Sequence, residues 1–395
     1  MGEFFVYNKN YAGKCYWTEK RSRVSSIFTY DGEYISGKDN WAIDPELLLL
    51  GGAQPLRYGL PSAFRDAAPD RWGQTLIRHR HMRSSRENAA PMRTISEVDY
   101  LMGVSDFTRQ DDLRFSLEKG GAFEHPSDDV PRLVSLPKLL NAAHRYTLEQ
   151  DEDAIKFLLD AGSASLGGAR PKAAVSDGEH LFISKFPHRH DKWDIMAWEW
   201  VSLSVARDAG ILVPENKLVS VDGQNVLLVK RFDRIGVERV SYISMMSMLG
   251  LVDGQNADYS EITERIRDVS VCVKDDLREL YRRIVLSLLL NNTDDHLRNH
   301  GFLRVGSGFR LSPIFDVNPN PISTEMRTTS VFGEIEKTAA LNALSNNINA
   351  FDLFSQEADT ISFQVTEAVK ASETYAIKAG IKKPEIKYML NSLGL

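Results

Sequence analysis

The sequence is nearly free of cysteine. Its two cysteines, Cys15 and Cys272, lie far apart and in no spacing that is typical of metal ligands. A disulfide framework is therefore not expected, and a reducing cytoplasm is the compartment that this composition favours. Charge of one sign is also scarce, because the formal net charge is only -6 over 395 residues. The overall charge thus gives no reason to expect binding to nucleic acid or to a membrane surface.

Long hydrophobic runs and leader sequences are missing as well. The densest apolar stretch, residues 284–290, is a third of the roughly 20 residues that a membrane-spanning helix needs, so no transmembrane segment is expected. The first seven residues are too polar and too short for the apolar core of a secretory signal. Val6 stands where a myristoylation signal has a hydroxyl residue. We therefore expect a cytoplasmic protein without a membrane anchor.

What is present is the composition of an ordinary globular protein, with 43% hydrophobic and 26% charged residues. A chain of this length is expected to form two or three packed lobes. Residues 1–145 mix short strand-like runs with turns and short helices, 146–232 predict a small sheet with one helix, and 233–395 are mainly helical. A sheet-rich part followed by a helical part predicts an α+β, bilobal architecture with a cleft.

Two local patterns give definite predictions. The alternating run 24–34 contains Asp31-Gly32, a dipeptide that is typical of hairpin turns, so a hairpin is predicted there. The strongest helix is predicted over 275–290, where apolar residues recur at helical spacing and either Asp275 or Asp276 can cap the first turn.

Phosphoryl transfer requires few protein groups, and candidates for several of them occur in chain order. The small residues of 162–168 expose backbone N–H groups that suit an anion. Lys185 lies 17 residues beyond this loop, on the second strand of a hairpin predicted over 170–186. A half-buried lysine needs a partner, and Glu199, 14 residues later on a helix predicted over 193–209, suits that role. Taken singly, a plain strand connection and a solvent-facing lysine explain these residues as well.

The sharpest signal is the segment 291–299, which places two Asp, one His and three Asn directly after an apolar helix. Asp294 and Asn299 are five residues apart, which is the spacing between the base and the metal-binding Asn of protein-kinase catalytic loops. Asp316 ends a short apolar strand-like run 17 residues later, where the second Mg²⁺ ligand is expected. Val317 follows it in place of the usual Phe-Gly, so this match rests on order and role.

At these positions the sequence resembles the HipA family of bacterial serine/threonine kinases, the toxins of HipBA-type toxin–antitoxin modules. The resemblance spans nearly the whole chain and rests on residues 69–73 after 60–64, on 166–172, 230–234, 293–299 and 312–316. It implies a bilobal protein-kinase-like fold. In that fold 1–145 would be a HipA-like N-terminal subdomain, 146–232 the kinase N-lobe with phosphate loop and hinge, and 233–395 the helical catalytic C-lobe.

The resemblance also implies a role for each matching residue. Asp294 would be the catalytic base with His296 beside it, and Lys185 would contact the phosphates of ATP. Asn299 and Asp316 would hold Mg²⁺. The residues expected around the nucleotide are Gly167, Gly168, Ala169, Arg170, Lys172, Lys185, Glu199, Lys230, Arg231, Phe232, His296, Asn299 and Asp316.

Regulation and partners are implied in the same way. Ser165 matches the serine that family members autophosphorylate, and Ser163 is a second candidate. A phosphate of roughly -2 charge in the loop that binds ATP would repel the nucleotide, so we expect this modification to inactivate the enzyme. The implied partners are a HipB-like DNA-binding antitoxin, operator DNA through that complex, and a protein substrate such as an aminoacyl-tRNA synthetase.

Two other functional classes stay open. A metal-dependent hydrolase could use Asp294, Asp295, His296 and His300 as an oxygen and nitrogen ligand set, but it would leave the glycine-rich loop and Lys185 unexplained. A non-catalytic pseudokinase or DNA-associated scaffold could use the arginines of 71–93 to contact nucleic acid. Such a run is also typical of a solvated helix face.

Overall fold

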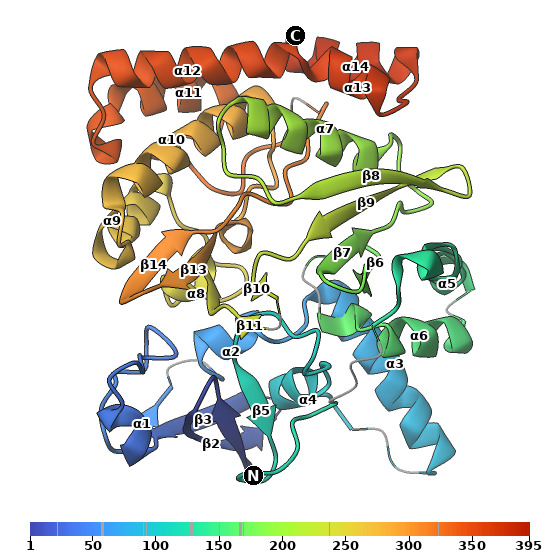
Figure 1. The fold of residues 1–395 in the computed structure, drawn as a ribbon, viewed down its shortest axis with the longest axis vertical. Coiled ribbons are helices and arrows are strands. Elements are labelled where there is room, and N and C mark those ends of the chain that lie inside the picture. Colours follow the sequence, from blue (N-terminus) through green and yellow to red (C-terminus); the bar gives the residue numbers. More distant parts are fainter. Residues whose placement is uncertain are drawn as a thin grey trace. The chain divides into compact units, whose positions relative to one another are not determined.

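The computed structural model divides the chain into two compact units (Figure 1). The first unit comprises Met1–Arg189, Asp233–Ile243 and Ser247–Val252, and the second comprises His190–Phe232, Ser244–Met246 and Asp253–Leu395. The domain bounds at 145 and 232 stay predictions. The structure describes all residues except Ser22, Arg57, Tyr58, Ala90, Met92, 126–129, Gln150, Leu166, Gly167, Ala169, Val237 and Ser323, and it leaves out the side chains of Glu149 and Ser165.

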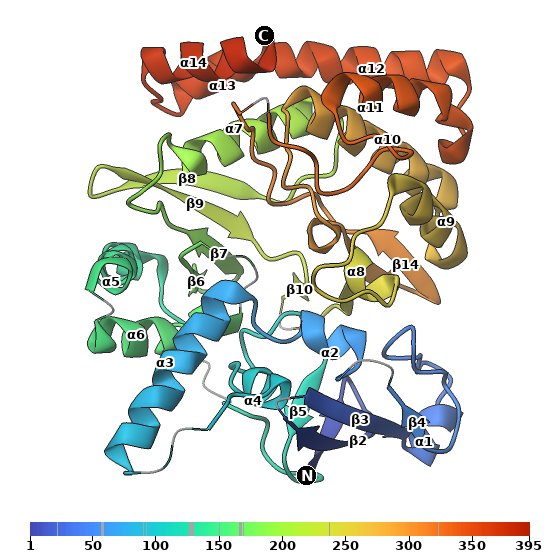
Figure 2. The same ribbon diagram turned by 180° about the vertical axis from the view of Figure 1, so that it is seen from behind.

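A five-stranded antiparallel sheet of order β4-β3-β2-β1-β5 opens the first unit (Figure 2). Alternate residues of β3 are buried, as expected for a strand with one face on a core. That core contains Phe4, Phe28, Phe64 and Phe115, each at most 1% exposed. The strands are β1 (Gly2–Tyr7), β2 (Tyr11–Lys20), β3 (Arg23–Tyr30), β4 (Gln54–Pro55) and β5 (Arg114–Ser116).

Helices and two small hairpins complete the first unit. The hairpin predicted over 170–186 is confirmed, because β6 and β7 pair antiparallel there. The elements are α1 (Gly32–Ser36), α2 (Ser62–Asp66), α3 (Arg71–Glu87), α4 (Glu97–Met102), η1 (Leu133–Ser135), α5 (Leu136–Glu149), α6 (Glu152–Asp160), η2 (Ser163–Ser165), β6 (Lys172–Ser176), β7 (Leu181–Lys185), β10 (Arg234–Ile235) and β11 (Glu238–Arg239). Two short elements, β12 (Tyr242–Ser244) and α8 (Met245–Met248), lie where the chain passes between the units.

The hairpin predicted at Asp31-Gly32 is wrong. Asp31 is instead the N-cap of α1, and its Oδ1 accepts a hydrogen bond from the Glu33 backbone N–H at 3.0 Å. The dipeptide is ambiguous, because an Asp followed by a flexible residue favours a helix start as well as a turn. Strand β3 pairs instead with the preceding strand β2, from Gly13 opposite Tyr30 to Lys20 opposite Arg23, and with β4 at its other edge.

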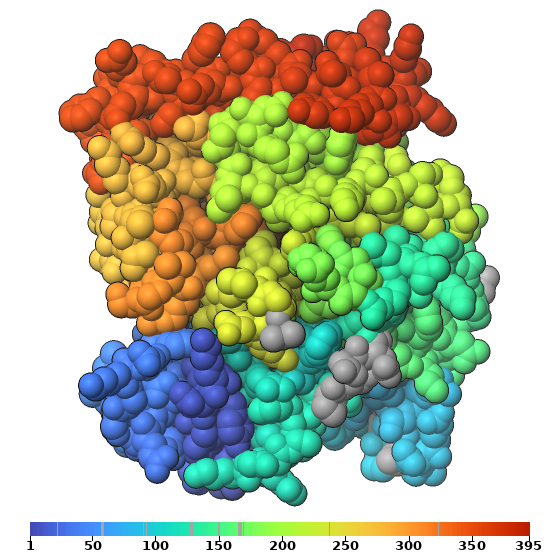
Figure 3. All heavy atoms as spheres, in the orientation of Figure 1, coloured from blue at the N-terminus to red at the C-terminus, as the bar shows by residue number. Residues whose placement is uncertain are grey.

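The second unit is mainly helical, which together with the sheets of the first unit confirms the α+β class. Helices α12 to α14 form one layer against α7 and α10, seen in orange and red in Figures 1 and 3. No helix in the described ranges is long and apolar enough to cross a membrane. The elements are α7 (Ile195–Asp208), β8 (Asn216–Val221), β9 (Gln224–Lys230), α9 (Tyr259–Val269), α10 (Val273–Leu289), η3 (Leu297–Asn299), β13 (Gly301–Val305), β14 (Gly308–Leu311), α11 (Lys337–Asn346), η4 (Ile348–Phe351), α12 (Ser355–Lys370), α13 (Ser372–Lys378) and α14 (Lys383–Leu393).

Helix α10 leads directly into the predicted catalytic segment. It begins two residues earlier than predicted, with Cys272 at the N-cap, so the predicted caps lie inside the first turn. Asp276 is buried there and accepts hydrogen bonds from Ser270 Oγ at 2.6 Å and Arg310 Nε at 2.9 Å. The helix stops before Asn291, whose φ of 49° lies in the left-handed region that Asn tolerates. This turn ends the helix and leads the chain into residues 292–299.

Candidate functional site

Two buried lysines lie directly opposite each other in the first unit. Lys172 on β6 and Lys185 on β7 are register partners of an antiparallel pair, so their side chains share one face of the hairpin. They are 6% and 9% exposed, respectively. Two neighbouring ammonium groups repel each other, and burial raises the cost of that repulsion. An anion with several charges bound over this face would offset that repulsion.

The predicted phosphate loop reaches Lys172. Gly168 has a φ of 88°, and a Cβ added to it would lie 2.5 Å from Lys172 Nζ, so glycine lets the backbone pass close to the ammonium. Arg170 follows and is half-buried just before β6. The predicted residues Gly167 and Ala169 lie outside the described residues. Backbone N–H groups and lysine side chains are the groups that commonly hold phosphates.

The side chain of only one of the two candidate phosphorylation sites, Ser163, is described by the structure. Ser163 begins the short helix η2, is 0% exposed, and its Oγ is buried with no hydrogen-bond partner. A buried hydroxyl without a partner costs about 1–3 kcal/mol. Ser165 ends the same helix, but its side chain lies outside the described residues. The Ser163 hydroxyl therefore cannot reach a nucleotide unless this part of the loop moves.

In the second unit, the buried carboxylate of Asp295 organises the catalytic segment. Its Oδ1 lies 3.0 Å from His300 Nε2, and its Oδ2 accepts from Tyr259 Oη at 2.5 Å and from Ser287 Oγ at 2.8 Å. Arg327 Nη2 approaches the same oxygen at 3.4 Å. Burial alone would raise the pKa of this carboxyl, but His300, Arg327 and the hydrogen bonds outweigh it and lower the pKa well below the ordinary value. Asp295 is thus a structural anion and not a free base.

Asp294, the neighbour of Asp295, points to the opposite side, because the Asp295 side chain lies in the core. Asp294 is exposed, whereas Asn299 is buried and donates from Nδ2 to the backbone carbonyl of Asp294 at 3.1 Å. This bond uses the amide nitrogen, so the amide oxygen is the atom of Asn299 that suits a cation. His296 is half-buried beside them, and its backbone N–H donates to Asp294 O at 3.0 Å. The structure therefore brings the predicted base, Asn299 and His296 into one short turn.

Asp316 follows an irregular segment and not a strand. The strand predicted over 311–316 is wrong, because β14 stops at Leu311 and residues 312–316 form no strand. Asp316 has a φ of 57°, a left-handed conformation that is costly for a non-glycine residue and is concentrated at functional sites. A cavity of about 10 Å³, the size of one water, is lined by Asn299 and by Phe315 and Val317 on either side of Asp316. The two predicted metal-binding segments are therefore neighbours.

The donor set formed by these segments fits Mg²⁺. An amide oxygen of Asn299 and a carboxylate of Asp316 are hard oxygen ligands, and Mg²⁺ commonly uses one or two such groups plus substrate phosphates. Among the described residues, no three His, Cys, Asp or Glu side chains gather as a metal site of their own. A metal held jointly by these residues and a nucleotide is consistent with that finding.

The predicted hinge has different surroundings at each of its residues. Lys230 ends β9 and pairs with Glu215, with Nζ and Oε2 3.4 Å apart, while Arg231 is only 4% exposed. The ring of Phe232 lies 5.7 Å from that of Phe315, the residue before Asp316. Within the second unit, the hinge and the metal segment are thus in contact through their aromatic rings.

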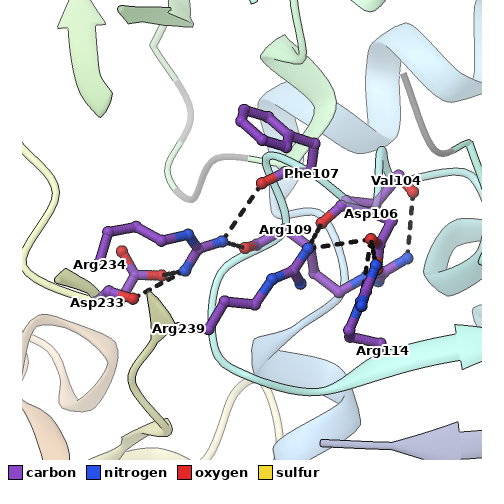
Figure 4. A network of polar contacts seen from close by, with 8 residues as sticks. All are labelled: Val104, Asp106, Phe107, Arg109, Arg114, Asp233, Arg234 and Arg239. Carbon is purple, nitrogen blue, oxygen red and sulfur yellow. Dashed lines mark hydrogen bonds and ion pairs between the residues drawn. The ribbon is translucent and has the colours of Figure 1, made fainter. Parts of the chain in front are cut away.

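The residues directly after the predicted hinge belong to the first unit and join a network of charged side chains there (Figure 4). Asp106 is its centre and accepts hydrogen bonds from Arg114 Nη2 at 2.6 Å and from Arg239 Nη2 at 3.0 Å. The Asp106 carboxylate is 5% exposed, so these are buried pairs that resist screening by salt. Sequence reasoning did not find this network, because Arg239 is 133 positions from Asp106.

The same network holds the chain after position 232. Arg234 Nη1 donates to Asp233 Oδ2 at 2.7 Å, and its Nη2 donates to the backbone carbonyl of Arg109 at 2.5 Å (Figure 4). Arg109 is 0% exposed and donates to three backbone carbonyls, and burial lowers the pKa of its guanidinium to about 9. Asp233, Arg234 and Arg239 are therefore held in the first unit by buried hydrogen bonds between charged groups.

The predicted pairing of Lys185 with Glu199 stays a prediction, because the two residues belong to different units. Glu199 is 1% exposed within α7. For the same reason, the two lysines of the first unit and the Asp294 segment of the second unit are two separate halves of the predicted site.

The alternative hydrolase site does not assemble. Asp295 and His300 bond to each other in the core, and their carboxylate oxygens and ring nitrogen are taken up by that pairing and by Tyr259. Asp294 is exposed, so it lies on the other side of the turn. The four proposed ligands therefore do not converge on one metal.

The arginine-rich run is partly neutralised by neighbouring acids. Arg83 pairs with Glu87 at 2.7 Å on α3, and Arg93 pairs with Asp99 at 2.5 Å. These pairs favour a solvated helix face over a continuous surface for nucleic acid.

One protein-family model matches more than half of the chain. Residues 164–375 match the profile of the family described as "HipA-like C-terminal domain". A Haemophilus influenzae protein described as "Putative kinase" is 28% identical over 142 residues, which are 31% of this chain and 41% of that protein. "Putative kinase Y4dM" of Sinorhizobium fredii is 28% identical over 159 residues, 36% of each chain. The chain thus spans less than half the length of these curated relatives.

A solved structure extends the likeness to the whole chain. The match is to the toxin–antitoxin complex of HipA, HipB and operator DNA from Shewanella oneidensis MR-1, with a TM-score of 0.68. It covers 99% of this chain and 95% of that chain at 14% sequence identity. A likeness at this identity shows the fold, so the predicted kinase-like α+β fold of the HipA kind is confirmed.

Proposed function

Because the chain belongs to the family of HipA-like C-terminal domains, we propose that it is an ATP- and Mg²⁺-dependent serine/threonine protein kinase. The observation that carries this proposal is the pair of buried lysines, Lys172 and Lys185, opposite each other on one hairpin, with the Gly168 backbone close to Lys172. An anion with several charges, such as the phosphates of ATP, balances both ammonium groups at once.

The residues of the second unit suit the remaining steps. Asp294 is exposed and accepts the proton of the substrate hydroxyl as that oxygen attacks the γ-phosphorus. Asn299 and Asp316 would hold Mg²⁺, which neutralises charge on the transferred phosphoryl group when it is bound. Asp295 fixes the turn that presents Asp294, through its pairing with His300. The protein mainly positions groups, as phosphoryl transfer requires.

We also propose a biological setting on the basis of the family. The protein would be the toxin of a HipBA-type module in the cytoplasm, held by a HipB-like DNA-binding antitoxin and, through it, by operator DNA. Its substrate would be a translation component such as an aminoacyl-tRNA synthetase. The match to a structure that contains HipA, HipB and operator DNA supports looking for such a partner first.

Replacing either buried lysine with methionine is expected to weaken ATP binding. Lys172→Met and Lys185→Met should each raise the Kd for Mg-ATP by about 10- to 100-fold, because a hydrogen bond between charged groups contributes about 1.5–3 kcal/mol. Isothermal titration calorimetry measures this directly. Lys217→Met, at a lysine whose side chain is 65% exposed, is the matched control and should bind ATP like the wild type. Equal affinity in all four proteins would contradict the phosphate site.

Autophosphorylation is expected at Ser165 and not at Ser163. The Ser163 hydroxyl is fully buried, so phosphorylating it requires a larger displacement of the loop. After incubation with Mg-ATP, phosphopeptide mapping by mass spectrometry should find the phosphate on Ser165. Ser165→Ala should abolish this signal, whereas Ser163→Ala should keep it. Phosphate on Ser163 in a protein that lacks it on Ser165 would refute the assignment.

A further inference from the structure

Residues 69–73 contact both ends of the predicted phosphate loop. These residues contain Asp70, the N-cap of α3, and the first three residues of that helix. They were recognised in the sequence only as a motif of the family, and the proposed chemistry gives them no role. All of their contacts described here lie within the first unit.

The carboxylate of Asp70 makes two hydrogen bonds at once. Its Oδ1 accepts from the Arg71 backbone N–H at 2.7 Å, which caps α3. Its Oδ2 accepts from the Gly168 backbone N–H at 2.7 Å, across 98 positions of sequence. One side chain therefore joins the start of the helix to the glycine that passes over Lys172.

Trp72 holds the same part of the loop from its other side. Its backbone N–H, one of the free donors at a helix start, donates to the Gly168 carbonyl at 3.1 Å. Its indole Nε1 donates to the Lys172 carbonyl at 3.1 Å. Both backbone groups of Gly168 are thus bonded to one turn of α3.

Gly73 lets the start of the loop approach α3. A Cβ added to Gly73 would lie only 2.2 Å from the backbone oxygen of Ala164, and 2.9 Å from its carbonyl carbon. No real Cβ tolerates such a distance, so an alanine would displace the loop backbone or the helix. The turn therefore contacts the loop at Ala164, at Gly168 and at Lys172.

We propose that this turn is a clamp that positions the phosphate loop for the nucleotide, with Asp70, Trp72 and Gly73 as positioning residues. The inference rests on the proposed function, because it assigns the turn to the binding of ATP. The clamp holds the backbone at Gly168 and Lys172 in place before the nucleotide arrives, so that binding loses less entropy there. It acts through Gly168 and Lys172 and does not touch the reacting atoms.

Two variants separate the clamp from the folding of α3. Ser is as good an N-cap as Asp, but its shorter side chain cannot also reach Gly168. Asp70→Ser should therefore leave the thermal unfolding midpoint unchanged and raise the Kd for Mg-ATP about ten-fold. Gly73→Ala should have the same effect on ATP. Both variants should bind adenosine with the same affinity as the wild type, because adenosine lacks the phosphates that would contact the loop.

The controls are Asp31→Ser and Gly32→Ala, the same substitutions at α1 of the same unit. Asp31 also caps a helix, and a Cβ on Gly32 would meet nothing within 4 Å. Neither control should change ATP binding. If Gly73→Ala does not fold, the comparison of Asp70→Ser with Asp31→Ser still tests whether the clamp affects ATP binding.

A second measurement separates failure of the clamp from failure of the proposed function. In hydrogen-exchange mass spectrometry without nucleotide, Asp70→Ser should speed exchange of the Gly168 amide, and Asp31→Ser should not. Wild-type protein that binds no ATP would refute the proposed function, while the exchange result would still test the clamp's contacts. Unchanged exchange, unchanged ATP affinity in both variants, or equal losses of ATP and adenosine binding would each overturn the clamp.

Discussion

Replacing Asp294 with asparagine is expected to lower the rate of phosphoryl transfer by about 10²- to 10⁴-fold, the contribution that is typical of a general base. The change removes the proton acceptor and keeps the shape of the side chain. It also spares the hydrogen bond from Asn299, because that bond goes to the backbone carbonyl of residue 294. The geometry of the turn should therefore survive, and the loss should fall on kcat.

The experiment compares wild type and Asp294→Asn with radiolabelled ATP, both alone and with a cell extract. Both autophosphorylation and transfer to other proteins should disappear, while the Kd for Mg-ATP stays within a factor of two or so of wild type. Asp253→Asn removes an exposed carboxylate of the same unit and serves as the control. Retained transfer in Asp294→Asn would remove this residue as the base and favour the scaffold interpretation if no other activity were found.

Elements with strong local periodicity could be predicted from the sequence. The helix predicted over 193–209 is α7, Ile195–Asp208, and Gly210 takes the left-handed φ of 77° that a helix stop favours. The hairpin over 170–186 was predicted for the same reason. Helix and turn preferences act over a few residues, so these elements can be predicted without knowledge of the rest of the chain.

The register of that hairpin could not be predicted. A two-residue turn at Asp177-Gly178 would place Lys172 opposite Ile183. In the structure the connection is longer, with the Asp177 N–H donating to the His180 carbonyl, so Lys172 lies opposite Lys185. The loop conformation decides the register, and with it the lysine pair that carries the proposed function.

The roles of the two adjacent aspartates also depend on distant residues. Nothing in the segment 291–299 says which carboxylate points inward. Asp295 is drawn into the core by Tyr259 and Arg327, which are 36 and 32 positions away. The spacing to Asn299 singled out Asp294 as the base. The sequence could not predict that Tyr259 and Arg327 bind the Asp295 carboxylate, because no periodicity or motif connects these positions.

The Asp295 carboxylate should also dominate the stability of the second unit. Asp295→Asn is expected to lower the free energy of unfolding by about 3–5 kcal/mol, the range for breaking a buried ion pair by removing one partner. Oδ1 faces His300 Nε2, while Oδ2 faces the Tyr259 hydroxyl and Arg327. If the new NH₂ group takes the position of Oδ2, it meets the guanidinium of Arg327, which can only donate. The positive charge of Arg327 also remains buried without its counterion.

The effect of pH follows from the lowered pKa of Asp295. A carboxyl whose pKa is lower in the folded than in the unfolded state stabilises the fold above the unfolded value, and this stabilisation is lost as the pH falls. The ordinary value is 3.8. The difference between wild type and Asp295→Asn in urea unfolding should therefore be complete at about pH 6 and shrink progressively below pH 3.8.

The matched control is the exposed ion pair of the same segment, between Arg298 and Asp253. Its atoms are 2.7 Å apart, but the Asp253 side chain is 80% exposed, so water and salt screen the attraction. Asp253→Asn should change the free energy of unfolding by less than about 1 kcal/mol. If Asp295→Asn were as mild as this control, the Asp295 network would not hold the catalytic turn. The exposed position of Asp294 would then need another cause.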